Sequence, residues 1–144
     1  MDENNHRILV VDDSQMILDL TRAILEREGY HVETSGGGDI ALHKLELMSM
    51  MEEKLPDLVI SDIEMPGING IELVRRCRKL YPQLCFIIRS GNITDYRKVL
   101  DTEEIPYLEK ISSSQIKDLT DKVKRELSKT GLKWFYITCL SWTD

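Results

Sequence analysis

The chain has 144 residues, of which 42% are hydrophobic and 31% charged, with a formal net charge of -6. This length suits one domain with one core, and the acidic balance argues against a general nucleic-acid or anionic-membrane surface, because both reward Lys and Arg. No apolar stretch approaches the roughly 20 residues that span a bilayer, and the polar start MDENNHRILVV is the wrong order for a secretory signal. The cysteines, Cys77, Cys85 and Cys139, form no CxxC pair, so we expect reduced thiols in a cytoplasmic protein.

Short apolar runs alternate with amphipathic stretches along the chain, which predicts strands and helices in turn. In chain order we predict a strand at 7–11, a helix at 14–28, a strand at 31–34, a helix at 38–54, a strand at 58–61, a helix at 71–80, a strand at 85–88, a helix at 94–101, a strand at 107–108 and a helix at 116–127. Ser14 can cap the first helix and Gly29 can end it, and the serines at 112–114 can cap the last. The helix at 94–101 has weak periodicity, and residues 48–54 look like extra length in the second helix or its loop.

Strands this apolar need cover on both faces. They indicate a doubly wound α/β fold, with a five-stranded parallel sheet, right-handed crossovers and helices on both faces. In the usual flavodoxin-like strand order, 2-1-3-4-5, the first and third strands are neighbours, and the chain reverses its winding direction between them. Ligands of such sheets bind outside the carboxyl ends of the strands, so we expect the functional residues there.

Three carboxylates fall at this edge of the predicted sheet. Asp12 and Asp13 end the first strand, and Asp62 ends the third. Like charges in one crevice repel each other, by about 4 kcal/mol per pair at about 4 Å and an effective dielectric constant near 20. A hard divalent cation offsets that repulsion, and Mg²⁺ keeps positions open for water and phosphate. A carboxylate beside it can attack phosphorus to give an acyl phosphate.

Two further polar side chains follow the neighbouring strands. Ser90 follows the fourth strand, and its hydroxyl can donate to a phosphoryl oxygen. Lys110 follows the fifth, and its ammonium can pair with the same group. Taken singly, Asp12 fits a helix cap, Ser90 a turn and Lys110 a solvated lysine. Their convergence from four strand ends favours a phosphoryl-transfer site.

Four motifs in this chain resemble those of response-regulator receiver domains in two-component signalling. They are VVDDS at 10–14, VISDIEMPGINGIEL at 59–73, the Ser-Gly pair at 90–91 and YLEK at 107–110. The resemblance covers about residues 7–128, so we predict a receiver domain over residues 1–128 and a separate C-terminal tail at 129–144.

The resemblance implies a role for each charged residue at these strand ends. Asp62 matches the phosphoacceptor, and Asp12 and Asp13 match the acidic pair that holds Mg²⁺ with it. Glu64 matches the position whose backbone carbonyl binds the metal. Lys110 matches the lysine that contacts the phosphoryl group and supports the chemistry.

Further matches concern the conformational switch. Ser90 matches the Ser/Thr that moves toward the phosphoryl group and shares in the chemistry, and Gly91 matches the small residue that leaves room for phosphate. Tyr107 matches the aromatic residue that swings inward when the serine moves. The side chains of Glu64 and Asn92 stand where the family tunes the lifetime of the acyl phosphate.

The implied function is that of a response regulator. A histidine kinase or a histidine phosphotransfer protein would donate the phosphoryl group to Asp62 in a Mg²⁺-dependent reaction. The changed face of the fourth helix, fifth strand and fifth helix would then bind a downstream protein target. Such a chain is not an enzyme beyond catalysing its own phosphorylation and dephosphorylation. We expect no direct nucleic-acid or membrane partner, and a homodimer stays open.

Two departures from the family pattern keep an alternative open. The family usually has Pro after the lysine, commonly with a cis bond, whereas Ile111 follows Lys110 here. A cis bond before a non-proline residue costs about 3 kcal/mol, so we expect a trans bond. The segment from 90 to 110 is also short and irregular, with Pro106 just before Tyr107. The alternative is a degenerate receiver that acts as a phosphorylation-independent interaction module.

A third class is a Mg²⁺-dependent phosphohydrolase with an aspartyl nucleophile. The common form needs a second acid two residues after a nucleophile that follows the first strand. Glu64 follows Asp62 at that spacing, but on the third strand, and Asp12 and Asp13 are adjacent. The sequence therefore disfavours this class.

The tail at 129–144 is rich in aromatic residues, and its role is unknown. It holds Trp134, Phe135, Tyr136 and Trp142. Left bare in water, these side chains would expose a sizeable apolar patch. The alternatives are packing back onto the same domain, a contact with a second copy or a partner, and the remainder of a linker.

Overall fold

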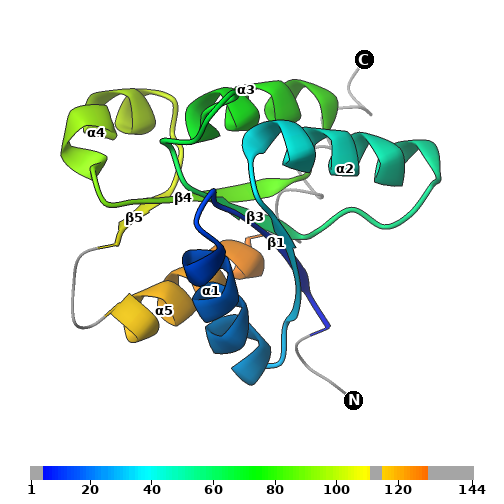
Figure 1. The fold of residues 1–144 in the computed structure, drawn as a ribbon, viewed down its shortest axis with the longest axis horizontal. Helices are drawn as coiled ribbons and strands as arrows, with labels where there is room; N and C mark the ends of the chain where they lie inside the picture. The colour runs from blue at the N-terminus through cyan, green and yellow to red at the C-terminus, as the bar shows by residue number, and fades with distance from the viewer. Residues whose placement is uncertain (1–4, 111–114, 130–144) are drawn as a thin grey trace.

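A parallel sheet lies between two layers of helices in the computed structural model, which describes residues 5–110 and 115–129 (Figure 1). The strands are β1 (Arg7–Val11), β2 (His31–Ser35), β3 (Leu58–Ser61), β4 (Cys85–Ser90) and β5 (Tyr107–Glu109). The helices are α1 (Gln15–Arg27), α2 (Gly38–Met50), α3 (Gly70–Leu80), α4 (Ile93–Thr102) and α5 (Gln115–Ser128). Every predicted strand and helix is present, in the predicted order.

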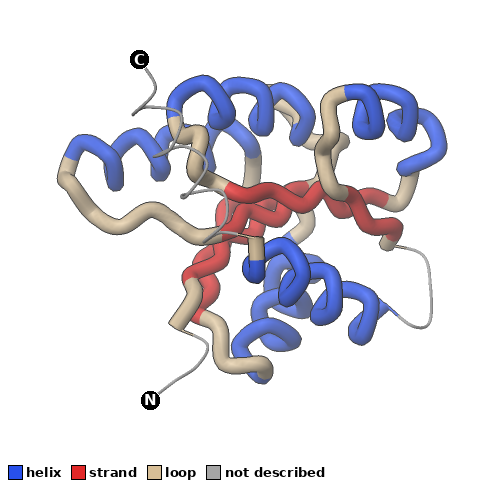
Figure 2. Tube along the Cα trace, turned by 180° about the vertical axis from the view of Figure 1, so that it is seen from behind, coloured by secondary structure: helices blue, strands red, loops and turns tan. Residues whose placement is uncertain are grey.

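The sheet has the order β2-β1-β3-β4-β5, with all neighbouring strands parallel. Helices α1 and α5 cover one face, and α2, α3 and α4 cover the other, as the two opposite views show (Figures 1 and 2). This confirms the predicted doubly wound fold. Val11 pairs with Ser61, so β1 and β3 end at the same level. The residues that follow them, Asp12 and Asp62, are therefore brought to one place.

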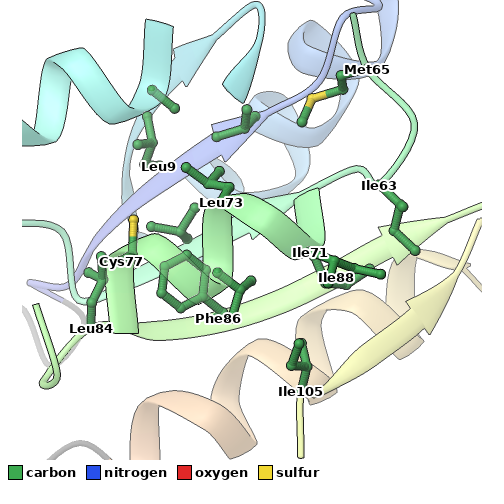
Figure 3. Close-up of a cluster of buried hydrophobic side chains, with 14 of the residues drawn as sticks. Leu9, Ile63, Met65, Ile71, Leu73, Cys77, Leu84, Phe86, Ile88 and Ile105 are labelled. Atoms are coloured by element: carbon green, nitrogen blue, oxygen red, sulfur yellow. The ribbon is translucent and has the colours of Figure 1, made fainter. Parts of the chain in front are cut away.

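The sheet buries side chains on both faces, which explains why its strands read as continuous apolar runs. Successive residues of β1 enter opposite clusters: Ile8 packs on the α1 and α5 side, and Leu9 on the side of α2, α3 and α4. In the second cluster, Leu73 and Cys77 of α3 pack with Phe86 of β4 (Figure 3). Both clusters hold the strands in place, and so hold the strand ends that carry the polar residues.

Helix boundaries agree with the local signals, with one correction. The Ser14 hydroxyl accepts a hydrogen bond from the N–H of Ile17 at 3.4 Å and caps α1 as predicted. Helix α2 ends at Met50, so the predicted end at 54 is wrong. Its backbone leaves the helix at Glu52, whose φ of 56° is left-handed. The weakly periodic segment does form α4, anchored by buried Ile93 and Leu100.

Some predictions concern residues outside the described ranges. They are the cap at 112–114, the bond between Lys110 and Ile111, and the tail from 130 onward. Cys77 is a free thiol, and both Cys77 and Cys85 are buried. Within the described ranges, no helix has both the length and the apolar character that a membrane crossing requires.

Candidate functional site at the carboxyl edge of the sheet

Three carboxylates gather where β1 and β3 end. One carboxylate oxygen from each of Asp12, Asp13 and Asp62 lies within 4.8 Å of the others, and we call these residues the acidic cluster. Asp12 is buried, Asp62 is half-buried and Asp13 is exposed. The N–H of Asp62 donates to the carbonyl of Val11 at 3.0 Å, which ties the two strand ends together. The structure thus brings together the three acids that the sequence singled out.

Backbone donors orient the two inner carboxylates. Oδ1 of Asp12 accepts a hydrogen bond from the N–H of Ser14 at 2.9 Å. Oδ1 of Asp62 accepts one from the N–H of Ile63 at 2.8 Å. In both residues Oδ2 faces Lys110, whose Nζ lies 2.6 Å from Asp12 and 3.4 Å from Asp62. Each carboxylate therefore has one oxygen held by the backbone and one held by a movable cation.

Lys110 reaches the acidic cluster although Ile111 stands where the family usually has Pro. Its N–H donates to the carbonyl of Ser90 at 3.1 Å, which continues the pairing of β4 and β5 by one residue. Only 18% of its side chain is exposed. One ammonium against three carboxylates leaves the site with an excess of negative charge.

The electrostatics of Asp62 reflect this crowding. Burial raises the pKa of the Asp62 carboxyl, the Lys110 ammonium opposes the rise, and the Asp12 carboxylate adds to it. The net result is a pKa above the ordinary aspartate value. Additional positive charge at the acidic cluster would therefore favour the ionised, nucleophilic form of Asp62.

The donor set of the acidic cluster fits Mg²⁺. All its side-chain ligands are carboxylate oxygens, which suit a hard cation. Two oxygens on opposite sides of an octahedral Mg²⁺ lie about 4 Å apart, so the observed 4.8 Å limit needs only a small contraction. The predicted backbone ligand, the carbonyl of Glu64, belongs to the loop that starts at Asp62, and its role as a ligand stays a prediction.

Glycines shape the loop between β3 and α3 around Asp62. The N–H of Gly70 donates to the carbonyl of Ile63 at 2.9 Å, and a Cβ at Gly70 would overlap the carbonyl oxygen of Asp62. Gly67 has a φ of 79°, where a side chain would be strained. The motif at 59–73 contains both glycines. Only the folded loop shows that position 70 must lack a side chain if the Asp62 backbone is to keep its observed position.

A polar network lies beside the acidic cluster at the start of α4. Buried Ser90 accepts a hydrogen bond at Oγ from the N–H of Asn92, at 3.2 Å. The Asn92 amide donates to Asp95 at 2.8 Å and reaches Glu64 at 3.5 Å. The Tyr96 hydroxyl donates to Glu64 at 3.1 Å. Sequence reasoning missed Tyr96, because no local pattern links α4 to the loop that follows Asp62.

Tyr107 lies on β5 and is half-buried. Its ring packs against the cluster on the α2, α3 and α4 side, near Asp101 of α4. Burial raises the pKa of this phenol, and Asp101 raises it further. In this arrangement Tyr107 packs beside α4, and the inward swing expected of it stays a prediction.

Comparisons with known proteins agree on one family. The sequence model described as the response regulator receiver domain matches residues 8–124. The alkaline phosphatase synthesis transcriptional regulatory protein PhoP of Bacillus subtilis is 36% identical over 99 residues, which are 69% of this chain and 39% of that protein. Sporulation initiation phosphotransferase F of Bacillus subtilis is 30% identical over 115 residues, which are 70% of this chain and 88% of that protein.

The match covers only part of some relatives. This chain spans 39% of the length of PhoP and 55% of the transcriptional activator protein ExaE of Pseudomonas putida. Among solved structures, response regulator TrrA of Thermotoga maritima, in complex with Mg²⁺-BeF, aligns with a TM-score of 0.71 and 36% identity over 83% of this chain and 97% of that one. A CheY-like receiver domain of Methanospirillum hungatei aligns with a TM-score of 0.76 and 31% identity over 90% of this chain and 99% of that one.

Proposed function

This chain belongs to the response regulator receiver family, and on that premise we propose that it accepts a phosphoryl group on Asp62 and signals by a change of conformation. The observation that carries the proposal is the acidic cluster, with the Lys110 ammonium in contact with two of its members. The separation of a receiver domain at 1–128 from a tail at 129–144 stays part of the proposal.

Asp62 is suited to be the nucleophile. Its Oδ1 is held by the N–H of Ile63, so Oδ2, which faces Lys110, is the oxygen left to attack. A phosphohistidine of a kinase or a phosphotransfer protein is the proposed donor. An Asp62 oxygen forms the new bond to phosphorus, the nitrogen–phosphorus bond breaks, and the donor imidazole leaves. Mg²⁺ held by the acidic cluster would neutralise charge on the phosphoryl oxygens. Lys110 would add a direct ion pair to the same oxygens.

Ser90 and Tyr107 would transmit the change. The Ser90 hydroxyl is engaged with the N–H of Asn92, so turning toward a phosphoryl group on Asp62 would exchange that contact and disturb the start of α4. Tyr107 packs near Asp101 of the same helix, so a shift of α4 would also change the surroundings of Tyr107. Phosphorylation would then shift the population between two arrangements of the face formed by α4, β5 and α5.

The proposed partners are proteins. The donor would be a histidine kinase or a histidine phosphotransfer protein, and the switched face would meet a downstream protein target. The net charge of -6 makes direct nucleic-acid binding unfavourable. The proposed location is the cytoplasm, where a free thiol such as Cys77 stays reduced.

A phosphorylation assay tests this function. The full chain is incubated with Mg²⁺ and acetyl phosphate, and intact mass is followed for an acid-stable, base-labile phosphoryl adduct. We expect an adduct in the wild type and none in Asp62→Asn or in excess EDTA. Asp121→Asn, on the exposed face of α5, is the matched control and should be phosphorylated normally.

Each other result has its own meaning. A wild-type chain without an adduct would refute phosphoryl transfer and favour the interaction module. An adduct that persists in Asp62→Asn would move the phosphoacceptor to another residue. Rapid hydrolysis of phosphate esters in solution would indicate a phosphohydrolase.

A further inference from the structure

An arginine lies buried on β4 directly before Ser90. Arg89 is only 5% exposed. Ile87, two residues earlier on the strand, packs in the cluster on the α1 and α5 side, so Arg89 faces the same layer of helices. Its Nη1 donates to the Thr21 hydroxyl of α1 at 2.8 Å. Its Nε has no hydrogen-bond partner among the described residues.

A guanidinium in this setting needs a source of negative charge. Burying a charge is costly unless an opposite charge compensates for it, and the Thr21 hydroxyl is neutral. Within the described ranges no carboxylate forms an ion pair with Arg89. Burial lowers the pKa of Arg89, and Asp12 and Asp62 raise it through space. Arginine stays protonated even so. The acidic cluster is thus what compensates Arg89, at a distance longer than an ion pair.

The charge of Arg89 matters differently before and after phosphorylation of the site. With Mg²⁺ bound, the acidic cluster, Lys110 and Arg89 carry a small excess of positive charge. Phosphorylation replaces the single negative charge of Asp62 by about two on the phosphoryl group. Asp12, Asp13 and the phosphoryl group are then balanced by Mg²⁺, Lys110 and Arg89 together. Without Arg89, the phosphorylated site keeps an unbalanced negative charge.

We propose that Arg89 is a positioning residue whose fixed buried charge favours the phosphorylated form of the site at the expense of Mg²⁺ affinity before phosphorylation. This inference rests on the proposed function. It assigns Arg89 opposite effects on the two ligands: it repels the metal cation and attracts the phosphoryl anion. A residue that only packed between β4 and α1 would change both affinities in the same direction, through loss of structure.

The test measures both affinities on the full chain. Mg²⁺ binding is measured by calorimetric titration, and beryllofluoride, an unreactive anionic analogue of the phosphoryl group, is titrated at saturating Mg²⁺ and followed by fluorine NMR. The variants are Arg89→Met and Arg89→Gln, both neutral, and Arg89→Lys, which keeps the charge. Arg76→Met is the matched control, because Arg76 lies on the exposed side of α3 and pairs with Glu72.

We expect the two neutral variants to bind Mg²⁺ about tenfold more tightly and beryllofluoride about threefold more weakly, since the metal carries twice the charge that the anion adds. Arg89→Lys and Arg76→Met should remain close to the wild type.

Unchanged affinities in a folded neutral variant, or affinities that fall together, would overturn the inference. So would failure of both neutral variants to fold, because Arg89 would then be a folding residue. A wild-type chain that binds Mg²⁺ but no beryllofluoride would refute the proposed function instead. The Mg²⁺ titrations would still test whether the charge of Arg89 weakens Mg²⁺ binding.

Discussion

Replacing Lys110 by Met tests the electrostatic account of the site. The Lys110 ammonium lies 2.6 Å from Oδ2 of Asp12 and 3.4 Å from Oδ2 of Asp62, and only 4% of the Asp12 side chain is exposed. Methionine keeps most of the aliphatic stem, so the substitution chiefly removes the charge. In Mg²⁺-free buffer we expect the free energy of unfolding to fall by about 3 kcal/mol.

That magnitude follows from the geometry. At an effective dielectric constant near 20, the contacts at 2.6 Å and 3.4 Å correspond to gross attractions of about 6 and about 5 kcal/mol. Most of this attraction is offset by the cost of taking the three groups out of water. Removing one partner of a buried pair costs about 3–5 kcal/mol because the other charge is left uncompensated. The half-buried position of Asp62 places the expected loss at the lower end of that range.

The assay is urea unfolding followed by circular dichroism, with EDTA and again with saturating Mg²⁺. The metal should restore much of the lost stability, because it supplies the positive charge that Lys110 no longer provides. Lys124→Met is the matched control: its ammonium lies 3.9 Å from a Glu28 oxygen, and 59% of its side chain is exposed. A surface pair of this kind contributes at most about 1 kcal/mol. A Lys110→Met variant as stable as the wild type in EDTA, or one that Mg²⁺ does not rescue, would refute the reasoning.

Three shorter predictions follow from other sites. Gly70→Ala should cost about 2–3 kcal/mol in urea unfolding and slow acetyl phosphate labelling, because its Cβ would overlap the Asp62 carbonyl; normal labelling and stability would contradict the loop geometry. Partial burial alone would raise the pKa of Glu33, but its ion pairs with Lys44 and Arg7 lower it overall, so their stabilisation is present above the unfolded pKa and is lost as pH falls through the folded one. Glu33→Gln should therefore cost up to about 1 kcal/mol at neutral pH and progressively less as the pH falls below the unfolded pKa, and a loss independent of pH would speak against the two pairs. Burial raises the pKa of Cys77 to about 12, so iodoacetamide at about pH 8 should label it only after unfolding, and rapid labelling of the folded chain would disprove its burial.

The fold was predictable from the sequence because its signals are local. Continuous apolar runs such as 7–11 mark strands covered on both faces, and Ser14 marks the start of α1 wherever the helix later packs. The acidic cluster was also predictable, because parallel strands end at one edge and each acid comes within two residues after a strand. These inferences need only the spacing of apolar residues along the chain and the parallel direction of the strands.

Contacts between distant segments needed the tertiary structure. Lys110 reaches Asp12 from 98 residues away along the chain, and Tyr96 of α4 reaches Glu64 in the loop that follows β3. The burial of Arg89 depends on α1 and α5 covering this face of the sheet, with Thr21 of α1 in contact with the guanidinium. In the sequence, Arg89 directly before Ser90 looks like an ordinary polar end of a strand. Only the packing of a helix far away in sequence removes that charge from water, because burial and electrostatic coupling depend on distances in space.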